Sequence, residues 1–433
     1  MTDTIDPSRQ GHGRMSMWSV SSLGIGSMVG AGIFALLGQA ALMTGSDVYL
    51  SFAVGGVIAL LSGYSYARLA ARFPSSGGIM DYFDRAFPSK TVAGGLSVLY
   101  LVTQIVNIAM VAKTFGAYAD RLLLGDVSAA YVANIFASAI VIVLFIVNMA
   151  GSGMVGRVEE LLVGIKLVIL TALLVAGGSS IDPAMLAQGP TVGPGILLAS
   201  VGLTFFAYGG YGMMTNASGH VADPAKTIPR AIFLAIGVVI VLYIGLSVVV
   251  MGNISPDELA RFTTTAVAQA AKPVLGQVGF VVVSIGALFA TASSINASFF
   301  CALEVSRGLA GKGQLPPVFE RVAWGQGTRG LVWSAGAVLV MVNLLDLGAI
   351  AQVAGATILI CYLGVFAAHW RLHGEAGGSR LPIVVGAALM AVVLVAFAVS
   401  LWSTQPSAIW LTGLAVAGSL GVEWLIQRRR RSS

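Results

Sequence analysis

The sequence predicts an all-α membrane protein with twelve transmembrane helices. Its 433 residues are 57% hydrophobic and only 10% charged, whereas soluble domains carry about 25% charged residues. The apolar residues also fall into runs of about twenty, which is the length that crosses the hydrocarbon core of a bilayer. These two observations exclude a soluble globular enzyme and leave channels, transporters and membrane-embedded enzymes.

Polar segments divide the chain into twelve candidate spans, with bounds good to about four residues. The spans are 18–43, 49–72, 93–119, 130–149, 158–178, 194–218, 230–251, 275–303, 329–346, 348–369, 381–400 and 406–426. The first span follows a polar segment that ends in Arg14. It is too long for a signal peptide and lacks a small-residue cleavage site, so we expect it to be retained.

The basic residues favour a cytoplasmic position for both termini. With the N-terminus inside, nineteen of the 24 Lys and Arg residues fall on the cytoplasmic side, and only Arg121, Arg261 and Lys272 fall outside. The other two, Lys113 and Lys166, lie within spans. Cytoplasmic loops of membrane proteins carry such an excess of basic residues. Because this bias accounts for the net charge of +6, we expect no nucleic-acid partner.

Motifs of metal and cofactor chemistry are absent from the sequence. It contains no H-E-x-x-H, no P-loop and no Cys/His cluster at metal-binding spacing. Both cysteines, Cys301 and Cys361, lie in apolar runs, so no disulfide framework is implied. We therefore expect no metal, no cofactor and no enzymatic activity.

Glycines interrupt two spans that lie five spans apart. The run 18–43 contains G-I-G-S-M-V-G-A-G-I-F, and the run 194–218 contains F-F-A-Y-G-G-Y-G. Glycine costs about 1 kcal/mol relative to alanine inside a helix, so these clusters need a physical reason. One reason is close packing of helices. The other is a duplicated, inverted half with a broken helix in each copy, and the odd separation of five spans favours it.

The sequence thus predicts two inverted five-helix repeats in which helices 1 and 6 are broken. The resulting segments are 1–17 (cytoplasmic N-terminal segment), 18–178 (first repeat, spans 1 to 5), 194–370 (second repeat, spans 6 to 10), 381–427 (spans 11 and 12) and 428–433 (basic cytoplasmic tail).

A break at the bilayer midplane predicts a binding site. It leaves backbone N–H and C=O groups without helical partners, and hydrocarbon does not tolerate this unless a cavity or a ligand satisfies them. A half-helix N-terminus at the break attracts a carboxylate, and carbonyls at a C-terminal end attract an ammonium group. A ligand with both charges is an α-amino acid.

Four strings resemble the amino acid, polyamine and organocation (APC) transporter superfamily, and most closely its prokaryotic proton-coupled amino acid permeases. They are G-A-G-I-F, F-F-A-Y-G-G followed by D-P-A-K-T-I-P-R-A-I, S-S-I-N-A-S-F-F-C-A-L-E-V-S-R-G-L-A-G-K-G-Q-L-P, and G-R-V-E-E-L-L-V-G-I-K-L. The resemblance covers about residues 18–370 and implies a LeuT-like fold, a place in the inner membrane and transport by alternating access.

By position, the resemblance also implies which residues bind the substrate. These are Ser27, Met28, Gly30, Ala31 and Gly32 at the first break and Phe206, Ala207, Tyr208 and Gly209 at the second. The N–H groups of Ala31 and Gly32 would hold the carboxylate. Carbonyls of the second break, with those near Ile25 and Met28, would bind the amino group, and the Phe206 ring would cap the pocket. Without the resemblance, Phe206 and Tyr208 would be interpreted as core aromatics.

Lys166 is the predicted coupling residue. Span 158–178 enters the bilayer near residue 157, so a rise of 1.5 Å per residue places Lys166 about 13 Å deep in a core about 30 Å thick. All eighteen acidic residues fall in loops, termini or span ends. Desolvation without a counter-charge favours a neutral amine, and a lysine, unlike an arginine, can then lose and regain a proton.

The resemblance places the Lys166 amine where sodium-coupled relatives bind their second sodium ion. It implies contacts with carbonyls near Gly24 and Ile25 and with a hydroxyl of Ser293 or Ser294. We therefore expect proton coupling or sodium-independent exchange. The alternative is a permanently charged, structural lysine. Lys113 lies near the outer end of its span, where its amine can reach the interface, and is interpreted as structural.

The expected substrate is a small neutral amino acid, because a cationic one would find no acid at midplane depth. An amine or polyamine carrier or an amino acid exchanger is the alternative within transport, and a channel or membrane receptor is the alternative from another class. Relatives that pair with a glycoprotein heavy chain use a cysteine in the loop after the third span. Residues 120–130 contain none, so no such partner is expected.

Overall fold

The structure is a computed structural model that describes residues 15–432 apart from four internal gaps. Residues 1–14, 76, 126–130, 152–154, 188–191 and 433 lie outside the described part, as do the side chains of 31, 155–160 and 429–432. Most of the predicted N-terminal segment 1–17 and part of the predicted basic tail 428–433 therefore lie outside it.

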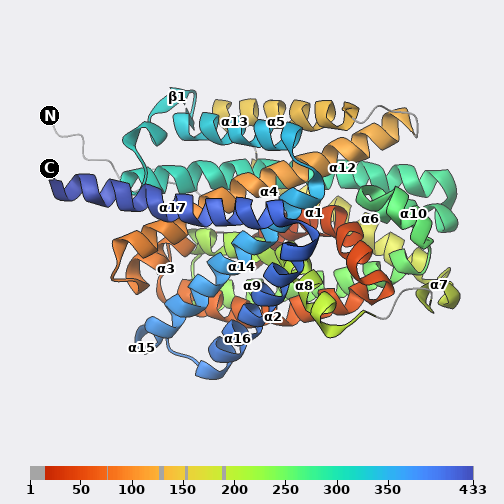
Figure 1. The fold of residues 1–433 in the computed structure, drawn as a ribbon, viewed down its shortest axis with the longest axis horizontal. Helices are drawn as coiled ribbons and strands as arrows, with labels where there is room; N and C mark the ends of the chain where they lie inside the picture. Colours follow the sequence, from red (N-terminus) through yellow and green to blue (C-terminus); the bar gives the residue numbers. More distant parts are fainter. Residues whose placement is uncertain (1–14, 76, 126–130, 152–154, 188–191, 433) are drawn as a thin grey trace.

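Helices make up almost the whole described chain, and long ones are joined by short elements (Figure 1). The long helices are α1 (Met17–Thr44), α2 (Val48–Arg72), α4 (Lys90–Leu124), α5 (Val132–Ala150), α6 (Val155–Gly178), α8 (Pro194–Tyr208), α9 (Pro224–Met251), α12 (Lys272–Gly311), α13 (Arg329–Leu344), α14 (Leu347–Arg371), α16 (Arg380–Thr404) and α17 (Pro406–Ser432). The short elements are η2 (Gly45–Asp47), α3 (Ile79–Ala86), α7 (Pro183–Ala187), η3 (Gly209–His220), α10 (Pro256–Arg261), η4 (Thr263–Thr265), α11 (Ala266–Gln269), η5 (Pro317–Phe319), the antiparallel strands β1 (Val322–Trp324) and β2 (Gly327–Thr328), and α15 (His373–Ala376).

Each predicted span overlaps a long helix, the sixth being α8 with η3. Within the described residues, ten segments are long and apolar enough to cross a membrane. One of these, of 56 residues, contains both α1 and α2, and α13 is a shorter apolar helix. A multi-pass, all-α membrane protein is therefore confirmed. The count of twelve and the inverted repeat remain predictions.

Several predicted spans are shorter than the helices that contain them. Helix α9 begins at Pro224 instead of 230, and α12 ends at Gly311 instead of 303. Local sequence explains the first difference, because Asp223 caps α9 by accepting a hydrogen bond from the Lys226 N–H, and Pro224 occupies the first helical position. Hydropathy predicts only the part of a helix that lies in the bilayer core. Capping residues determine where the helix itself begins, which can be outside that core.

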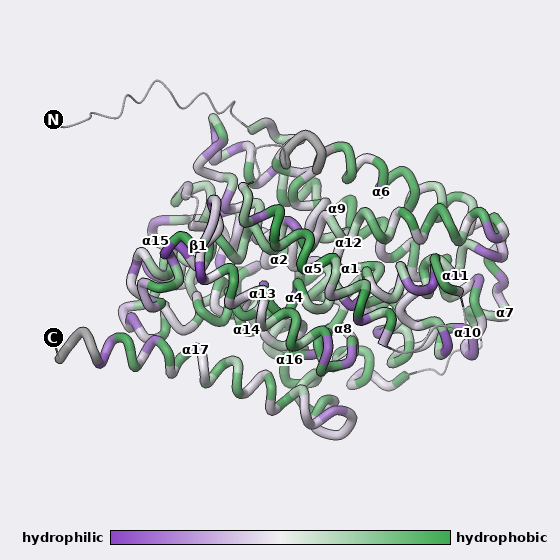
Figure 2. Tube along the Cα trace, turned by 90° about the horizontal axis from the view of Figure 1, so that it is seen from above, coloured by the Kyte–Doolittle hydropathy of each residue, from purple (hydrophilic) through white to green (hydrophobic). Residues whose placement is uncertain are grey.

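The molecule has two polar ends. Figure 1 shows α3, α15, β1 and the end of α17 at one end, and α7 and α10 at the opposite one. Figure 2 shows hydrophilic residues gathered toward these ends, with hydrophobic residues along the helices between them. The helices between the ends include exposed apolar side chains such as Val168, Val399 and Leu414. This is the arrangement expected of helices that cross a bilayer.

The predicted break in helix 1 is wrong for this structure. Helix α1 is continuous from Met17 to Thr44. Its glycines instead permit close packing: a Cβ atom on Gly30 would lie 2.6 Å from the Ala290 carbonyl oxygen of α12, and one on Gly32 would lie 2.8 Å from the Ala207 Cβ of α8. The packing interpretation of these glycines, open at the sequence level, therefore applies to the first span.

The predicted interruption of helix 6 is confirmed. Helix α8 ends at Tyr208, and the chain continues as the twelve-residue 3₁₀ segment η3 from Gly209 to His220. Such long 3₁₀ runs are uncommon. Close contact with α1 accompanies the change, because a Cβ atom on Gly210 would lie 2.6 Å from Ser27 Oγ and 2.7 Å from the Met28 nitrogen.

Candidate functional site

A central cavity lies where α8 gives way to η3. Helices α1, α4 and α14 complete its wall. The lining residues are Ser27, Thr103, Gln104, Asn107, Phe206, Ala207, Gly209, Gly210, Met213 and Ile358. No ionisable side chain is among these described lining residues. The cavity therefore suits an uncharged ligand side chain.

The structure brings four of the predicted binding residues to this cavity, namely Ser27, Phe206, Ala207 and Gly209. Tyr208 is not among them, because its hydroxyl donates a hydrogen bond to the Phe52 carbonyl oxygen at 2.9 Å. Ile25 and Met28 are buried in the core.

The predicted carboxylate site at Ala31 and Gly32 requires correction. Both residues lie within the continuous helix α1, so their N–H groups do not border a break. Gly30 and Gly32 pack against neighbouring helices, and the side chain of Ala31 lies outside the described part. Of the two predicted breaks, the structure shows the one at the junction of α8 and η3.

Sequence reasoning missed six lining residues, namely Thr103, Gln104, Asn107, Gly210, Met213 and Ile358. Three of them come from α4. One signal was available, because Gln104 and Asn107 are amides within the predicted span 93–119. Polar side chains in a transmembrane helix face the bundle interior or a cavity.

Three polar side-chain atoms in the wall already form hydrogen bonds. Thr103 Oγ1 donates to the Leu99 carbonyl oxygen at 2.8 Å, Ser27 Oγ to Met213 Sδ at 3.0 Å, and Asn107 Nδ2 to Ser298 Oγ at 2.8 Å. In contrast, Asn107 Oδ1 is buried and accepts no hydrogen bond from the described residues.

The cavity is small in this state. Its volume is about 20 Å³, which is enough for about one water molecule. Two tyrosines hold carbonyls of the surrounding segments: Tyr362 donates to the Gly209 oxygen, and Tyr243 Oη lies 2.7 Å from the Met28 oxygen and 3.2 Å from the Ala207 oxygen. A ligand larger than water therefore does not fit the cavity in this state.

Lys166 lies deep in the bundle. Its side chain is 1% exposed, and Nζ donates a hydrogen bond to the Gly26 carbonyl oxygen of α1 at 2.7 Å. The acceptor is one residue beyond the predicted Gly24 and Ile25, and Gly26 directly precedes the lining residue Ser27. The predicted hydroxyl residues Ser293 and Ser294 are buried on α12, which contacts both α1 and α6.

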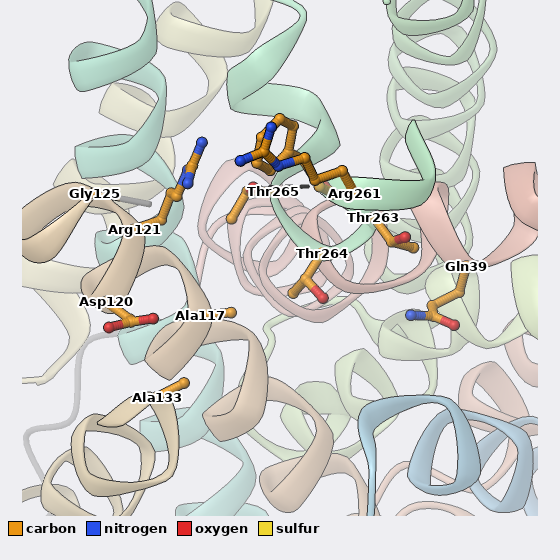
Figure 3. A pocket seen from close by; sticks show the side chains of 11 residues that line it. Gln39, Ala117, Asp120, Arg121, Gly125, Ala133, Arg261, Thr263, Thr264 and Thr265 are labelled. Atoms are coloured by element: carbon orange, nitrogen blue, oxygen red, sulfur yellow. Dashed lines mark hydrogen bonds between the residues drawn. The ribbon is translucent and has the colours of Figure 1, made fainter. Parts of the chain in front are cut away.

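A second, larger cavity of about 530 Å³ lies at the end of the molecule that holds α10 (Figure 3). Arg121 and Arg261 both border it, and their Cζ atoms lie 4.2 and 5.0 Å from the centre of the Phe262 ring. Asp120, Gln39 and Thr263 also line it. Both arginines belong to the three basic residues predicted to lie outside.

The opposite end is held together by an ion cluster. Lys312 Nζ, just beyond α12, lies 2.6 Å from Asp81 Oδ1 and 2.6 Å from Asp84 Oδ2 of α3. Burial alone would raise the pKa of Asp81, but the hydrogen bonds from Lys312 and Ser75 and the nearby positive charges lower it overall. Burial alone would lower the pKa of Lys312, but the two carboxylates raise it.

Together, the fold and the site define a membrane transporter: apolar helices surround a polar, uncharged cavity at a helix interruption, with a wider cavity at one end and an ion-paired opposite end. The chain belongs to the amino acid permease family, because residues 15–417 match the model of that family. This match confirms the resemblance to the APC superfamily.

Named relatives agree with this assignment. The chain is 43% identical to the inner membrane transport protein YbaT of Escherichia coli K12, over 97% of this chain and 98% of that protein. It is 26% identical to the cationic amino acid transporter 9, chloroplastic, of Arabidopsis thaliana, over 71% of this chain and 57% of that protein. It is also 26% identical to the glutamate/serine transporter AimA of Bacillus subtilis, over 58% of this chain and 49% of that protein. The protein is thus a multi-pass membrane transporter of an amino acid transport family.

Proposed function

We propose that the protein is a secondary active transporter that moves small neutral amino acids across the inner membrane by alternating access. Proton coupling through Lys166, without sodium, is part of this proposal. The observation that carries it is the uncharged cavity at the junction of α8 and η3, one residue away from the carbonyl that Lys166 binds.

The lining of the cavity supports a neutral substrate. Its described residues offer hydroxyl, amide, thioether and apolar groups but no charge. A charged substrate side chain would lose its hydration there without gaining an opposite charge, which is costly in a bundle interior. The backbone carbonyls at the end of α8 remain suited to an ammonium group.

The position of Lys166 supports proton coupling. Its ammonium group donates to Gly26, and the next residue, Ser27, lines the cavity. Hydrogen bonds from a charged donor are stronger than those from a neutral one. Loss of the proton therefore weakens the attachment of α6 to α1 at the turn that borders the substrate. The same amine binds the Gly26 carbonyl oxygen, which is the kind of ligand that a sodium ion at this place would need.

The two ends support alternating access with both termini in the cytoplasm. The wide cavity borders Arg121 and Arg261, two of the three basic residues assigned outside. At the other end, the Asp81–Lys312–Asp84 cluster joins α3 to the end of α12. We assign the wide cavity to the outer entrance and the ion-paired end to the closed cytoplasmic side.

The test is uptake by purified protein in liposomes, with Lys166→Ala compared with wild type. We expect an inward proton gradient to drive accumulation of a neutral amino acid by wild type, and Lys166→Ala to reduce it at least about tenfold, because the proton site is gone. Counterflow without a gradient separates loss of coupling from loss of transport.

The matched control is Lys113→Ala, since Lys113 is also an intramembrane lysine and donates to Asn134 Oδ1 at 2.8 Å, away from the cavity. It should keep gradient-driven uptake. Undiminished gradient-driven uptake by Lys166→Ala would end the coupling proposal. Failure of wild type to exchange any amino acid, or conductance without saturation, would end the transport proposal itself.

A further inference from the structure

Helix α4 places a polar face on one wall of the central cavity. Thr103, Gln104 and Asn107 line it, and their spacing of one and three residues puts them on one side of a helix. Gln104 is 6% exposed. Met213 and Ile358 also line the cavity. The site therefore offers both amide and apolar groups.

Asn107 Oδ1 is a buried acceptor on this wall to which no described residue donates a hydrogen bond. The other end of the same amide is fixed, because Nδ2 donates to Ser298 Oγ of α12 at 2.8 Å. Oδ1 is buried and accepts no hydrogen bond within the described part of the chain. Fixing one end of the amide holds the carbonyl end in place, so the acceptor is preorganised.

The unpaired acceptor distinguishes between substrates. Asn107 Oδ1 is buried and no described residue donates to it, so leaving it unsatisfied costs free energy. A bound ligand recovers that free energy only if it donates a hydrogen bond to Oδ1. A hydroxyl or carboxamide on the substrate has such a donor, whereas a methyl group does not.

We infer that the central cavity selects neutral amino acids whose side chain ends in a hydroxyl or a carboxamide over aliphatic ones of the same shape, with Asn107 and Gln104 as the specificity-determining residues. This inference rests on the proposed function and adds the substrate class to it. Met213 and Ile358, which also line the cavity, supply apolar contacts for the carbon atoms of the substrate side chain.

Isosteric pairs test the inference directly. Threonine and valine differ only in a hydroxyl in place of a methyl group, and asparagine and leucine have similar shapes. In counterflow with purified wild-type protein in liposomes, we expect the half-saturation concentration of the polar member of at least one pair to be at least about tenfold lower than that of its apolar partner. That ratio corresponds to about 1.4 kcal/mol.

Two variants assign the selectivity to α4. In Asn107→Leu, and separately in Gln104→Met, we expect the polar-to-apolar ratio of half-saturation concentrations to fall below about threefold. Where a variant loses counterflow, the same ratio is measured by binding to the purified protein, and thermal unfolding in detergent shows that the variant is folded. The control is Asn343→Leu on α13, where the amide is exposed and donates to Ser138 and to the Leu339 carbonyl. It should keep the wild-type ratio.

The outcomes separate the two proposals. Equal half-saturation for both members of each pair in wild type would overturn the selectivity and leave the transporter intact. A wild-type ratio that survives in both α4 variants would overturn the assignment to Asn107 and Gln104. No counterflow of any amino acid by wild type would overturn the proposed function along with this inference.

Discussion

Single hydroxyl groups hold the segments around the central cavity in place. Tyr243 Oη of α9 lies within hydrogen-bond distance of the carbonyls of Met28 in α1 and Ala207 in α8. It has one proton, so the two acceptors share it. This places one side chain between the two segments that the sequence assigns to the substrate site.

Tyr243→Phe removes this shared bond and keeps the ring. We expect the free energy of unfolding to fall by about 1 kcal/mol, which is the usual net contribution of one hydrogen bond. We also expect the half-saturation concentration for substrate to change. Denaturant unfolding in detergent and counterflow measure the two effects. Tyr131→Phe, at an exposed tyrosine, is the control. Unchanged stability together with unchanged half-saturation would refute this role of Tyr243.

Residues of the site were predictable only in part. Ser27, Phe206, Ala207 and Gly209 follow from motifs that the family resemblance carries, and they line the cavity. Asn107 was not identified, because its importance depends on Ser298 fixing one end of the amide across 191 residues of sequence separation. A single sequence shows that a polar residue lies in a span, but not which neighbours it meets.

Contacts between helices explain the glycines better than breaks do. Gly30 on α1 lies against α12 so closely that an added Cβ would meet the Ala290 carbonyl oxygen at 2.6 Å. Backbone atoms cannot turn aside as a side chain can. The glycine-rich sequence of α1 therefore sets how near α1 and α12 approach each other.

Gly30→Ala should destabilise the protein by about 1–3 kcal/mol, the usual cost of overpacking. The matched control is Gly237→Ala in α9, where an added Cβ meets no atom within 4 Å. That variant should be neutral or stabilised by up to about 1 kcal/mol, because alanine is the better helix former. Denaturant unfolding of both proteins in detergent checks this. Equal stability of the two variants would contradict the packing role of Gly30.

Helix positions were predicted well, whereas only one of the two predicted helix breaks was correct. A bilayer demands about twenty apolar residues for each crossing, so every predicted run overlaps a long helix. Glycine permits both unwinding of a helix and close packing of two helices. Hydropathy does not show which of the two a given glycine serves. The α8–η3 interruption was predicted correctly, and the continuous α1 was predicted wrongly.

At the scale of the whole molecule, the Asp81–Lys312–Asp84 cluster governs the closed end. The lowered pKa of Asp81 means that its contribution to stability is present above its unfolded value of about 3.9 and is lost as the pH falls through the folded value. The raised pKa of Lys312 means that its contribution is present below about 10.4 and is lost as the pH rises through the folded value. Asp81 and Lys312 are therefore both charged between about pH 5 and 9.

This charge state predicts that Lys312→Gln changes transport without changing the shape of its pH dependence between about pH 5 and 9. The variant loses both ion pairs, so the end near α3 opens more readily, and we expect a different maximal counterflow rate. Rates measured across this pH range for wild type and variant provide the test. The exposed Lys226, paired with Asp223 at 3.3 Å, offers the control Lys226→Gln. A pH profile displaced only in Lys312→Gln would show that the cluster itself senses protons.

The single-water volume of the central cavity also has an energetic meaning for the cell. A cavity of about 20 Å³, bordered by aromatic rings and tied carbonyls, offers no continuous file of solvent between the two compartments. Through the described residues of this cavity, a carrier at rest in this state leaks few ions and so conserves the electrochemical gradient. Scarcity of nutrient then costs the cell little leakage current.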